Sequence, residues 1–228
     1  MNLALVLALV GVAMPQPWGD LYRRDHVLVL GAPGCGKTPF AASLAAAARR
    51  VVYYDPTGEW TPLGETVSGE LVRELVEADA VAAADDLLAG TFRRLVVTPS
   101  DDEEEAVEDF RATVKLCRAA AHHGGLVFLA DEVGDLTDGG AAATLRALHR
   151  NGHKAGIATI LASPCWTDIP ARCRATRSRV YSFAQLADAD IETMNRELGR
   201  VVPGFGELAA AWKYPAPPVA WVSPTLHA

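Results

Sequence analysis

A glycine-rich stretch has the composition and spacing of a phosphate-binding loop. Residues 31–38 read GAPGCGKT and follow the apolar run at residues 27–30. They match the pattern G-x-x-x-x-G-K-[ST] at every fixed position, between a predicted strand and a predicted helix as the pattern requires. The glycines let backbone N–H groups turn toward phosphate oxygens, and the start of a helix favours an anion. The predicted nucleotide-binding residues are Gly31, Ala32, Pro33, Gly34, Cys35, Gly36, Lys37 and Thr38.

Two side chains of this loop and two later carboxylates form a predicted catalytic set. Lys37 is placed to contact the β- and γ-phosphates of ATP, and the Thr38 hydroxyl is placed to ligate Mg²⁺. Asp131 and Glu132 directly follow the apolar run at residues 126–130. A carboxylate at the end of a buried strand suits a water-mediated Mg²⁺ ligand, and a second one suits a base for water. We therefore predict ATP hydrolysis with Mg²⁺, in which Asp131 helps to bind the metal and Glu132 polarises the attacking water.

Positive charge is concentrated in the segment that follows these carboxylates. The chain of 228 residues has a net charge of −7, which excludes a surface that is basic throughout. Residues 146–179, in contrast, contain seven arginines and lysines and a single acid, Asp168. Such a segment can neutralise DNA phosphates or insert an arginine into a neighbouring subunit's ATP site. The candidates for an arginine that acts in trans are Arg150, Arg174 and Arg179.

The elements that must position these residues alternate between strands and helices. An alanine-rich helix is expected over residues 41–50, and a capping box at residues 100–103 predicts the start of another helix. The alternation predicts an α/β fold of the P-loop NTPase (RecA-like) type, a three-layer sandwich with a mostly parallel central sheet flanked by helices. Strands are predicted at residues 26–30, 51–54, 95–98, 126–130, 157–163 and 180–183.

Length and composition predict one domain preceded by a short apolar segment. We expect the P-loop domain to span residues 20–228, and residues 1–19 to form an apolar segment with a proline-rich connector. The apolar run at residues 3–14 would reach only about 18 Å as a helix, against roughly 30 Å for a bilayer core. It also lacks the charge and cleavage pattern of a secretion signal. It either packs on the domain or makes a peripheral contact with a membrane or a partner.

The cysteines do not indicate a disulfide framework or a zinc site. The four cysteines lack dense, regular spacing, which is typical of proteins in a reducing compartment. A zinc site assembled from His149, His153, Cys165 and Cys173 would match none of the common ligand spacings. We therefore expect neither feature to organise the fold.

Three further segments resemble a family of DNA motors. Residues 55–60, DPTGEW, resemble the D-P-x-G-E-[YW] signature of the FtsK–HerA superfamily of DNA-pumping ATPases. Residues 149–170 are similar to the segment that contains the sensor strand of that superfamily, and residues 174–183 to the strand that follows. The resemblance extends from about residue 26 to about residue 200. In its length, the chain resembles the genome-packaging ATPases of tailless double-stranded DNA viruses with an internal membrane.

The resemblance implies an ATP-driven motor that packages a viral genome into a preformed capsid. It implies a ring of subunits, expected to be a hexamer, that moves double-stranded DNA through its centre. Capsid-vertex or virion membrane proteins would be its partners, in the host cytoplasm and the virion, without secretion. A ring would gather modest basic loops into one charged channel, which reconciles DNA binding with an acidic chain.

One departure from the family pattern leaves other functions open. The family usually has a glutamine after the sensor strand, where this chain has Pro164, so the sensor role is assigned to Ser163. A filamentous-phage assembly ATPase of the zonula-occludens-toxin type is one alternative. A structural, nucleotide-binding virion component with negligible turnover is another. A small P-loop kinase is a third, opposed by the Asp131–Glu132 pair and by the motif at residues 55–60.

Overall fold

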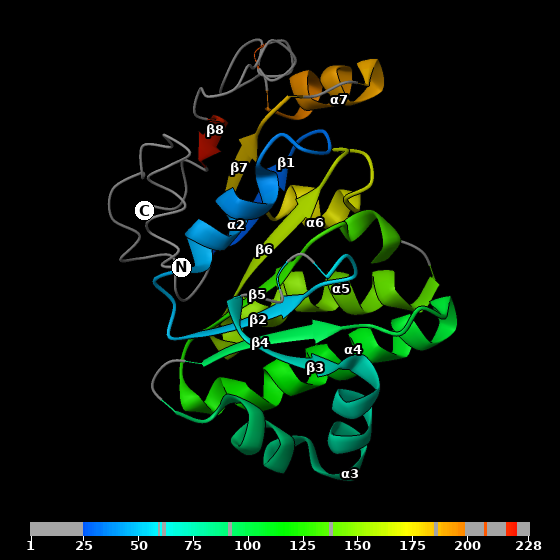
Figure 1. The fold of residues 1–228 in the computed structure, drawn as a ribbon. Coiled ribbons are helices and arrows are strands. Elements are labelled where there is room, and N and C mark those ends of the chain that lie inside the picture. The colour runs from blue at the N-terminus through cyan, green and yellow to red at the C-terminus, as the bar shows by residue number, and fades with distance from the viewer. Residues whose placement is uncertain are drawn as a thin grey trace.

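A twisted sheet forms the centre of the computed structural model (Figure 1). The structure describes residues 25–58, 60, 63–90, 93–136, 139–184, 187–198, 208 and 218–222. The predicted N-terminal segment, residues 1–19, lies outside the described residues, and the boundary at residue 20 therefore stays a prediction. Within the described ranges, no helix combines the length and the apolar character needed to cross a membrane.

The sheet has eight strands, of which seven are parallel and the last is antiparallel. Their order across the sheet is β3-β4-β2-β5-β6-β1-β7-β8. The predicted α/β class with a mostly parallel sheet is therefore confirmed. The strands are β1 (His26–Leu30), β2 (Arg50–Tyr54), β3 (Glu65–Ser68), β4 (Arg93–Thr98), β5 (Leu126–Ala130), β6 (Ile157–Ser163), β7 (Arg179–Ser182) and β8 (Val219–Val222).

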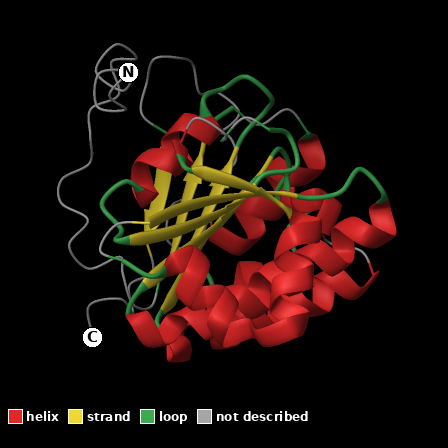
Figure 2. Ribbon diagram, turned by 60° about the horizontal axis from the view of Figure 1, so that its bottom comes forward, coloured by secondary structure: helices red, strands yellow, loops and turns green. Residues whose placement is uncertain are grey.

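Helices cover both faces of the sheet, but unequally (Figure 2). Helix α2 packs on one face, whereas residues of α3 to α7 belong to the core of the other face. The α-helices are α2 (Lys37–Ala45), α3 (Gly69–Leu88), α4 (Glu103–Ala120), α5 (Gly139–Asn151), α6 (Ala171–Ala175) and α7 (Asp188–Leu198). The short 3₁₀ helices are η2 (Ala121–His123), η3 (Val133–Leu136) and η4 (Gly152–Ala155).

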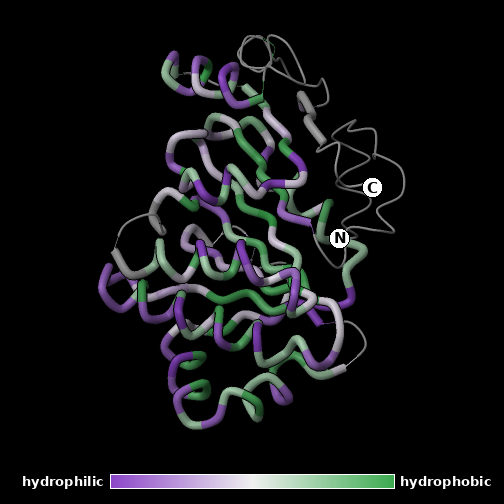
Figure 3. Tube along the Cα trace, turned by 180° about the vertical axis from the view of Figure 1, so that it is seen from behind, coloured by the Kyte–Doolittle hydropathy of each residue, from purple (hydrophilic) through white to green (hydrophobic). Residues whose placement is uncertain are grey.

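Strand β1 shows why the central strands read as unbroken apolar runs. Val27 and Val29 belong to the core beneath α2, while Leu28 and Leu30 belong to the core on the opposite face. All four are fully buried, as expected for a parallel strand covered on both sides. In Figure 3 the hydrophobic colour is accordingly concentrated in the central strands. The six predicted strands are all present, within one residue or two of their predicted bounds.

The predicted helix over residues 41–50 is wrong in its position. Helix α2 begins at Lys37 and ends at Ala45, and Arg50 begins strand β2. The Arg50 guanidinium donates from Nε to the Leu88 carbonyl at 3.0 Å, from Nη1 to the His123 carbonyl at 2.8 Å and from Nη2 to the Gly90 carbonyl at 2.9 Å. These tertiary hydrogen bonds outweigh the local helix propensity of the alanine-rich run.

The predicted capping box is also wrong, although a helix does begin nearby. Helix α4 is capped by Asp102, whose Oδ1 accepts from the backbone N–H of Glu104 at 3.0 Å and of Glu105 at 3.1 Å. Ser100 instead donates from Oγ to Asp109 Oδ2 at 2.8 Å. The buried Asp109 carboxylate requires hydrogen bonds from the protein, and Ser100 is within reach to supply two, from its hydroxyl and its backbone N–H.

A buried histidine pair lies between β1, β6 and α5. The rings of His26 and His149 are 4.1 Å apart, and the Nδ1 atoms lie 2.8 Å and 3.1 Å from the Thr159 hydroxyl oxygen. Burial, and to a lesser extent the charge of a neighbouring histidine, lowers the pKa of His26 to about 4 and that of His149 to about 3. Both rings are therefore neutral near pH 7. His149 thus packs in the core against the ring of His26.

This pair predicts a specific loss of stability in weak acid. The folded pKa values lie below the unfolded value of about 6.5, so the unfolded chain takes up protons first as the pH falls. The free energy of unfolding should therefore decrease between pH ~6.5 and ~4. Urea unfolding across this range should show a shallower decrease for His149→Gln than for the wild type. Equal slopes would contradict the assignment, since the carboxylates titrate alike in both proteins.

A candidate nucleotide site at the carboxyl edge of the sheet

The glycine-rich loop connects the end of β1 to the start of α2. Gly34 and Gly36 have φ values of 75° and 94°, which side chains rarely allow. At Gly31 a Cβ atom would lie 2.6 Å from Cys35 Sγ and 2.7 Å from Phe183 Cβ, so a larger residue does not fit. The glycines thus serve the loop in two ways: Gly34 and Gly36 allow its backbone conformation, and Gly31 leaves room for the neighbouring side chains. Such a loop leaves backbone N–H groups available to an anion at the start of α2.

The loop is joined to the end of β5 by two side-chain contacts. Lys37 Nζ lies 2.8 Å from Glu132 Oε1, and Thr38 Oγ1 donates to Asp131 Oδ2 at 2.8 Å. Strand β6 lies between β1 and β5, and all three strands are parallel, so their carboxyl ends meet at one edge. The structure therefore brings together two pairs of adjacent residues that lie more than 90 positions apart in the sequence.

At this edge, burial and neighbouring charges shift the pKa values of Lys37 and Asp131 in opposite directions. Burial alone would lower the pKa of Lys37, but the hydrogen bond that Lys37 donates to Glu132 and the charges of Asp131 and Glu132 outweigh it and raise the pKa. Burial raises the pKa of Asp131, while the Thr38 hydrogen bond and the Lys37 charge oppose that rise. Lys37 is therefore held as a cation between two carboxyl groups, which is the charge needed to bind phosphate.

Glu132 has an unusual backbone conformation. Its φ is 47°, and it is the only non-glycine residue with a positive φ in the described part of the chain. This conformation costs about 1–2 kcal/mol for an L-residue. Its backbone N–H donates to Asp131 Oδ1 at 3.0 Å, which helps to hold it. The turn directs the Glu132 side chain back toward Lys37, and strain of this kind often accompanies function.

The glycine-rich loop and the two carboxylates after β5 line a pocket of about 320 Å³, a volume within the usual range for small-molecule sites. The motif at residues 55–60 contains no predicted site residue, yet Thr57 lines the pocket. The buried Asp55 carboxylate accepts from Thr57 Oγ1 at 3.1 Å and from the Trp60 backbone N–H at 2.8 Å, which shapes this turn. The motif at residues 55–60 follows β2 at the same edge of the sheet, and this position could have indicated Thr57 as a site residue. The lining residues are Pro33, Gly34, Gly36, Lys37, Thr38, Pro39, Thr57, Asp131 and Glu132.

Ser163 lies at the end of β6, beside the glycine-rich loop. Its carbonyl accepts from the Gly31 backbone N–H at 3.2 Å, and its hydroxyl accepts from the Cys165 backbone N–H at 3.3 Å. Ser163 is fully buried and is not among the residues that line the pocket. In this arrangement it supports the loop, and its role as a sensor stays a prediction.

The three candidate arginines lie in different surroundings. Arg150 is exposed on α5 and makes no hydrogen bond or ion pair with the described residues. Arg179 Nη2 lies 3.3 Å from the buried Asp25 carboxylate, at the amino end of β7 and thus away from the glycine-rich loop. Arg174 is bound within its own subunit. Of the three, Arg150 is the one with a guanidinium that is available to a neighbour.

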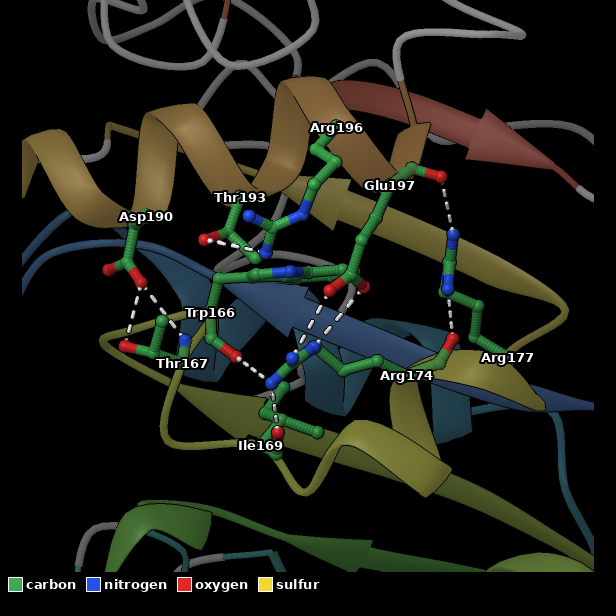
Figure 4. A network of polar contacts seen from close by, with 9 residues as sticks. All are labelled: Trp166, Thr167, Ile169, Arg174, Arg177, Asp190, Thr193, Arg196 and Glu197. Atoms are coloured by element: carbon green, nitrogen blue, oxygen red, sulfur yellow. Dashed lines mark hydrogen bonds and ion pairs between the residues drawn. The ribbon is translucent and has the colours of Figure 1, made fainter.

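Arg174 joins α6, the turn after β6 and α7 (Figure 4). Its Nε and Nη2 lie 3.2 Å and 3.1 Å from the two Glu197 carboxylate oxygens, and its Nη1 donates to the Ile169 carbonyl at 2.6 Å. The guanidinium groups of Arg174 and Arg177 lie 5.6 Å and 5.4 Å from the centre of the buried Trp166 ring. Burial lowers the pKa of Arg177. This set of contacts fastens α7 to the domain.

The comparison with protein families identifies the domain. The family described as the AAA ATPase domain matches residues 20–160, more than half of the chain. The chain belongs to this family. A comparison with curated protein sequences found no match. The P-loop interpretation of residues 31–38 is therefore supported by the family as well as by the geometry.

Solved structures show the same fold as this AAA ATPase domain. The genome packaging NTPase B204 from Sulfolobus turreted icosahedral virus 2, in complex with AMPPCP, superposes with a TM-score of 0.57 at 18% identity. That match covers 83% of this chain and 88% of the other. VirB4 of Thermoanaerobacter pseudethanolicus superposes with a TM-score of 0.61 at 13% identity, over 85% and 87% of the two chains. The resemblance to FtsK–HerA-type ATPases is thus confirmed at the level of the fold.

Two substitutions separate nucleotide binding from hydrolysis in this AAA ATPase domain. Lys37→Ala should weaken ATP binding about 10- to 100-fold, because it removes a charged hydrogen bond to phosphate. Glu132→Gln should keep ATP binding but slow hydrolysis by roughly 10²–10⁴, because an amide cannot act as a base. Binding of a fluorescent ATP analogue and phosphate release check the two effects separately. Full turnover in Glu132→Gln would exclude it as the base.

The Arg174 contacts predict a structural effect. Arg174→Ala should lower the free energy of unfolding by about 2 kcal/mol, because it leaves the half-buried Glu197 carboxylate without its partner. The matched control is the exposed Arg172→Ala, which should change stability by less than about 0.5 kcal/mol. Urea denaturation of the three proteins measures both. Equal stability of Arg174→Ala and Arg172→Ala would show that the network contributes little.

Proposed function

We propose that this P-loop ATPase is a Mg²⁺-dependent motor that translocates double-stranded DNA and packages a viral genome into a preformed capsid. Two contacts support Mg²⁺-dependent ATP hydrolysis: Lys37 contacts Glu132, and Thr38 contacts Asp131. The fold supports the role in genome packaging, since one protein of similar structure is named as a genome packaging NTPase.

The contacts at the sheet edge suit the hydrolysis of ATP. Lys37 would exchange the Glu132 carboxylate for a nucleotide phosphate, and the carboxylate would then be free to accept a proton from water. Thr38 and Asp131 present oxygen atoms of the kind that Mg²⁺ prefers, and their 2.8 Å contact places both at one point. Bound Mg²⁺ would neutralise charge on the phosphates. A base positioned for water favours hydrolysis over transfer to an acceptor.

Three exposed arginines of α5 and α6 supply the basic surface that a DNA motor requires. Arg146, Arg150 and Arg172 line one depression of about 330 Å³. None of the three guanidinium groups makes a hydrogen bond or ion pair with the described residues. Their charges are therefore available to phosphate groups, either of DNA or of ATP bound to a neighbour. We assign the trans role to Arg150 and charge complementarity with DNA to the whole set.

A ring of subunits would unite these roles. It would place Arg150 of one subunit near the ATP of the next and gather the arginines of several subunits around one DNA duplex. We propose a hexamer that acts in the host cytoplasm and at the packaging vertex of the virion, with capsid or virion membrane proteins as partners. A peripheral membrane contact by residues 3–14 belongs to the same proposal.

The test is steady-state ATP hydrolysis with and without long double-stranded DNA, over a range of protein concentrations. The proposal predicts that DNA stimulates turnover and that activity per subunit rises cooperatively with concentration. Arg150→Ala should reduce turnover about 10³-fold or more while leaving ATP affinity unchanged. The control variant is Lys154→Ala, which removes an exposed cation of η4.

Negligible turnover at every concentration, with normal ATP binding, would favour a structural nucleotide-binding component instead. Turnover that is independent of DNA would contradict the translocase while leaving the ATPase intact. Full activity of Arg150→Ala would remove it as the arginine that acts in trans.

A further inference from the structure

Two histidines and an aspartate converge at the edge of the sheet opposite the ATP site. Asp85 lies in the last turn of α3, and His122 and His123 lie in η2. The two Nε2 atoms are 3.3 Å and 2.8 Å from Asp85 Oδ1, and the two ring centres are 3.9 Å apart. The three ligand atoms lie within 4.8 Å of one another. These elements precede strands β4 and β5, so the cluster is at the amino ends of strands whose carboxyl ends face ATP.

The hydrogen bond of the His122 ring leaves its Nε2 atom facing the Asp85 carboxylate. The Nδ1 atom of His122 contacts the carbonyl of Ala119, and a carbonyl can only accept, so Nδ1 carries the proton. In the neutral ring, Nε2 then presents a lone pair to Asp85. A carboxylate and a lone pair at this distance repel each other, so either a proton on Nε2 or a metal ion must lie between them. A backbone carbonyl on the second ring nitrogen is also the arrangement that commonly orients histidine ligands of metals.

His123 supports the same interpretation independently. Its Nε2 atom is buried and, although 2.8 Å from Asp85 Oδ1, makes no hydrogen bond with Asp85 or with any other described residue. The two atoms are therefore close without being aligned as donor and acceptor. In a metal site the ligand lone pairs point at a common centre and not at one another, which accounts for a short distance without alignment.

The segments that carry the three ligands are held in place by Arg50. Its guanidinium donates to the Leu88 carbonyl beyond Asp85 in α3, to the Gly90 carbonyl and to the carbonyl of His123 itself. The buried arginine thus ties the end of α3 to η2 before any ion binds. A preorganised ligand set loses less conformational entropy on binding.

We propose that Asp85, His122 and His123 bind one divalent transition-metal ion of the Zn²⁺ class. Two imidazoles and a carboxylate favour Zn²⁺, Co²⁺, Ni²⁺ or Cu²⁺ over Mg²⁺ and Ca²⁺, which prefer all-oxygen sites. Water would complete a tetrahedral coordination, since the Asp85 and His122 side chains are half exposed. The ion would staple the C-terminal end of α3 to the segment that follows α4. Its role is structural, because ATP binds at the opposite edge of the sheet.

The test uses the full chain, with any affinity tag removed, in excess Mg²⁺ so that the ATP site is not available to the probe. Calorimetric titration with Zn²⁺ and with Co²⁺ should show one saturable site per chain. Asp85→Asn, His122→Gln and His123→Gln should each weaken binding at least tenfold, on the order of the loss seen when a metal's supporting residues are removed. The matched control His153→Gln removes a half-buried histidine outside the cluster and should bind as the wild type does.

Two further readouts distinguish this site from the four free thiols. The Co²⁺ complex should lack a thiolate-to-cobalt charge-transfer band. Zn²⁺ should raise the Tm of the wild type and of His153→Gln but not that of the three ligand variants, because an ion bound only by the folded state stabilises it. A thiolate band, equal affinity in wild type and variants, or no saturable binding below about 100 μM would each overturn the proposal.

Discussion

The architecture depends on the meeting of three parallel strand ends. Because β6 separates β1 from β5 and all three run in one direction, the glycine-rich loop, Ser163 and the Asp131–Glu132 pair emerge at one edge of the sheet. The Lys37–Glu132 and Thr38–Asp131 contacts then fix the loop against the carboxylates. A single register shift in β5 would reverse the faces of its side chains and break both contacts. Alternate residues of β5 belong to the cores on opposite faces, so such a shift would also move each of them into the other core.

The segment after β6 connects this edge to the last helix. Ser163 holds the start of the loop through Gly31, and three residues later Trp166 packs beside Arg174 and Arg177. These arginines in turn bind Glu197 of α7, as Figure 4 shows. One short stretch of chain therefore contacts both the nucleotide loop and the outermost helix. Part of the basic segment thus has a structural role, which leaves Arg146, Arg150 and Arg172 as its exposed, unpaired arginines.

The sequence was informative where local pattern and tertiary structure demand the same residues. The loop at residues 31–38, the buried strands and the carboxylates after β5 could be predicted because each has one function that few residue types can serve. The end of α2 could not be predicted, because Arg50 looks like a helix-terminating cation until its distant carbonyl partners are known. The same holds for Ser100, whose hydroxyl is drawn to Asp109. Among the cations of residues 146–179, only three-dimensional contacts separate the buried Arg174 network from the exposed Arg150.

In the proposed function, ATP hydrolysis at this edge moves the protein along a DNA duplex. The most direct measurement is the displacement of a labelled third strand from the end of a long linear duplex, with wild type and Glu132→Gln compared at equal DNA binding. The wild type should displace the third strand in a reaction that requires hydrolysable ATP and increases with protein concentration, whereas Glu132→Gln should displace none. ATP hydrolysis together with DNA binding, but without displacement at any concentration, would contradict the proposed function.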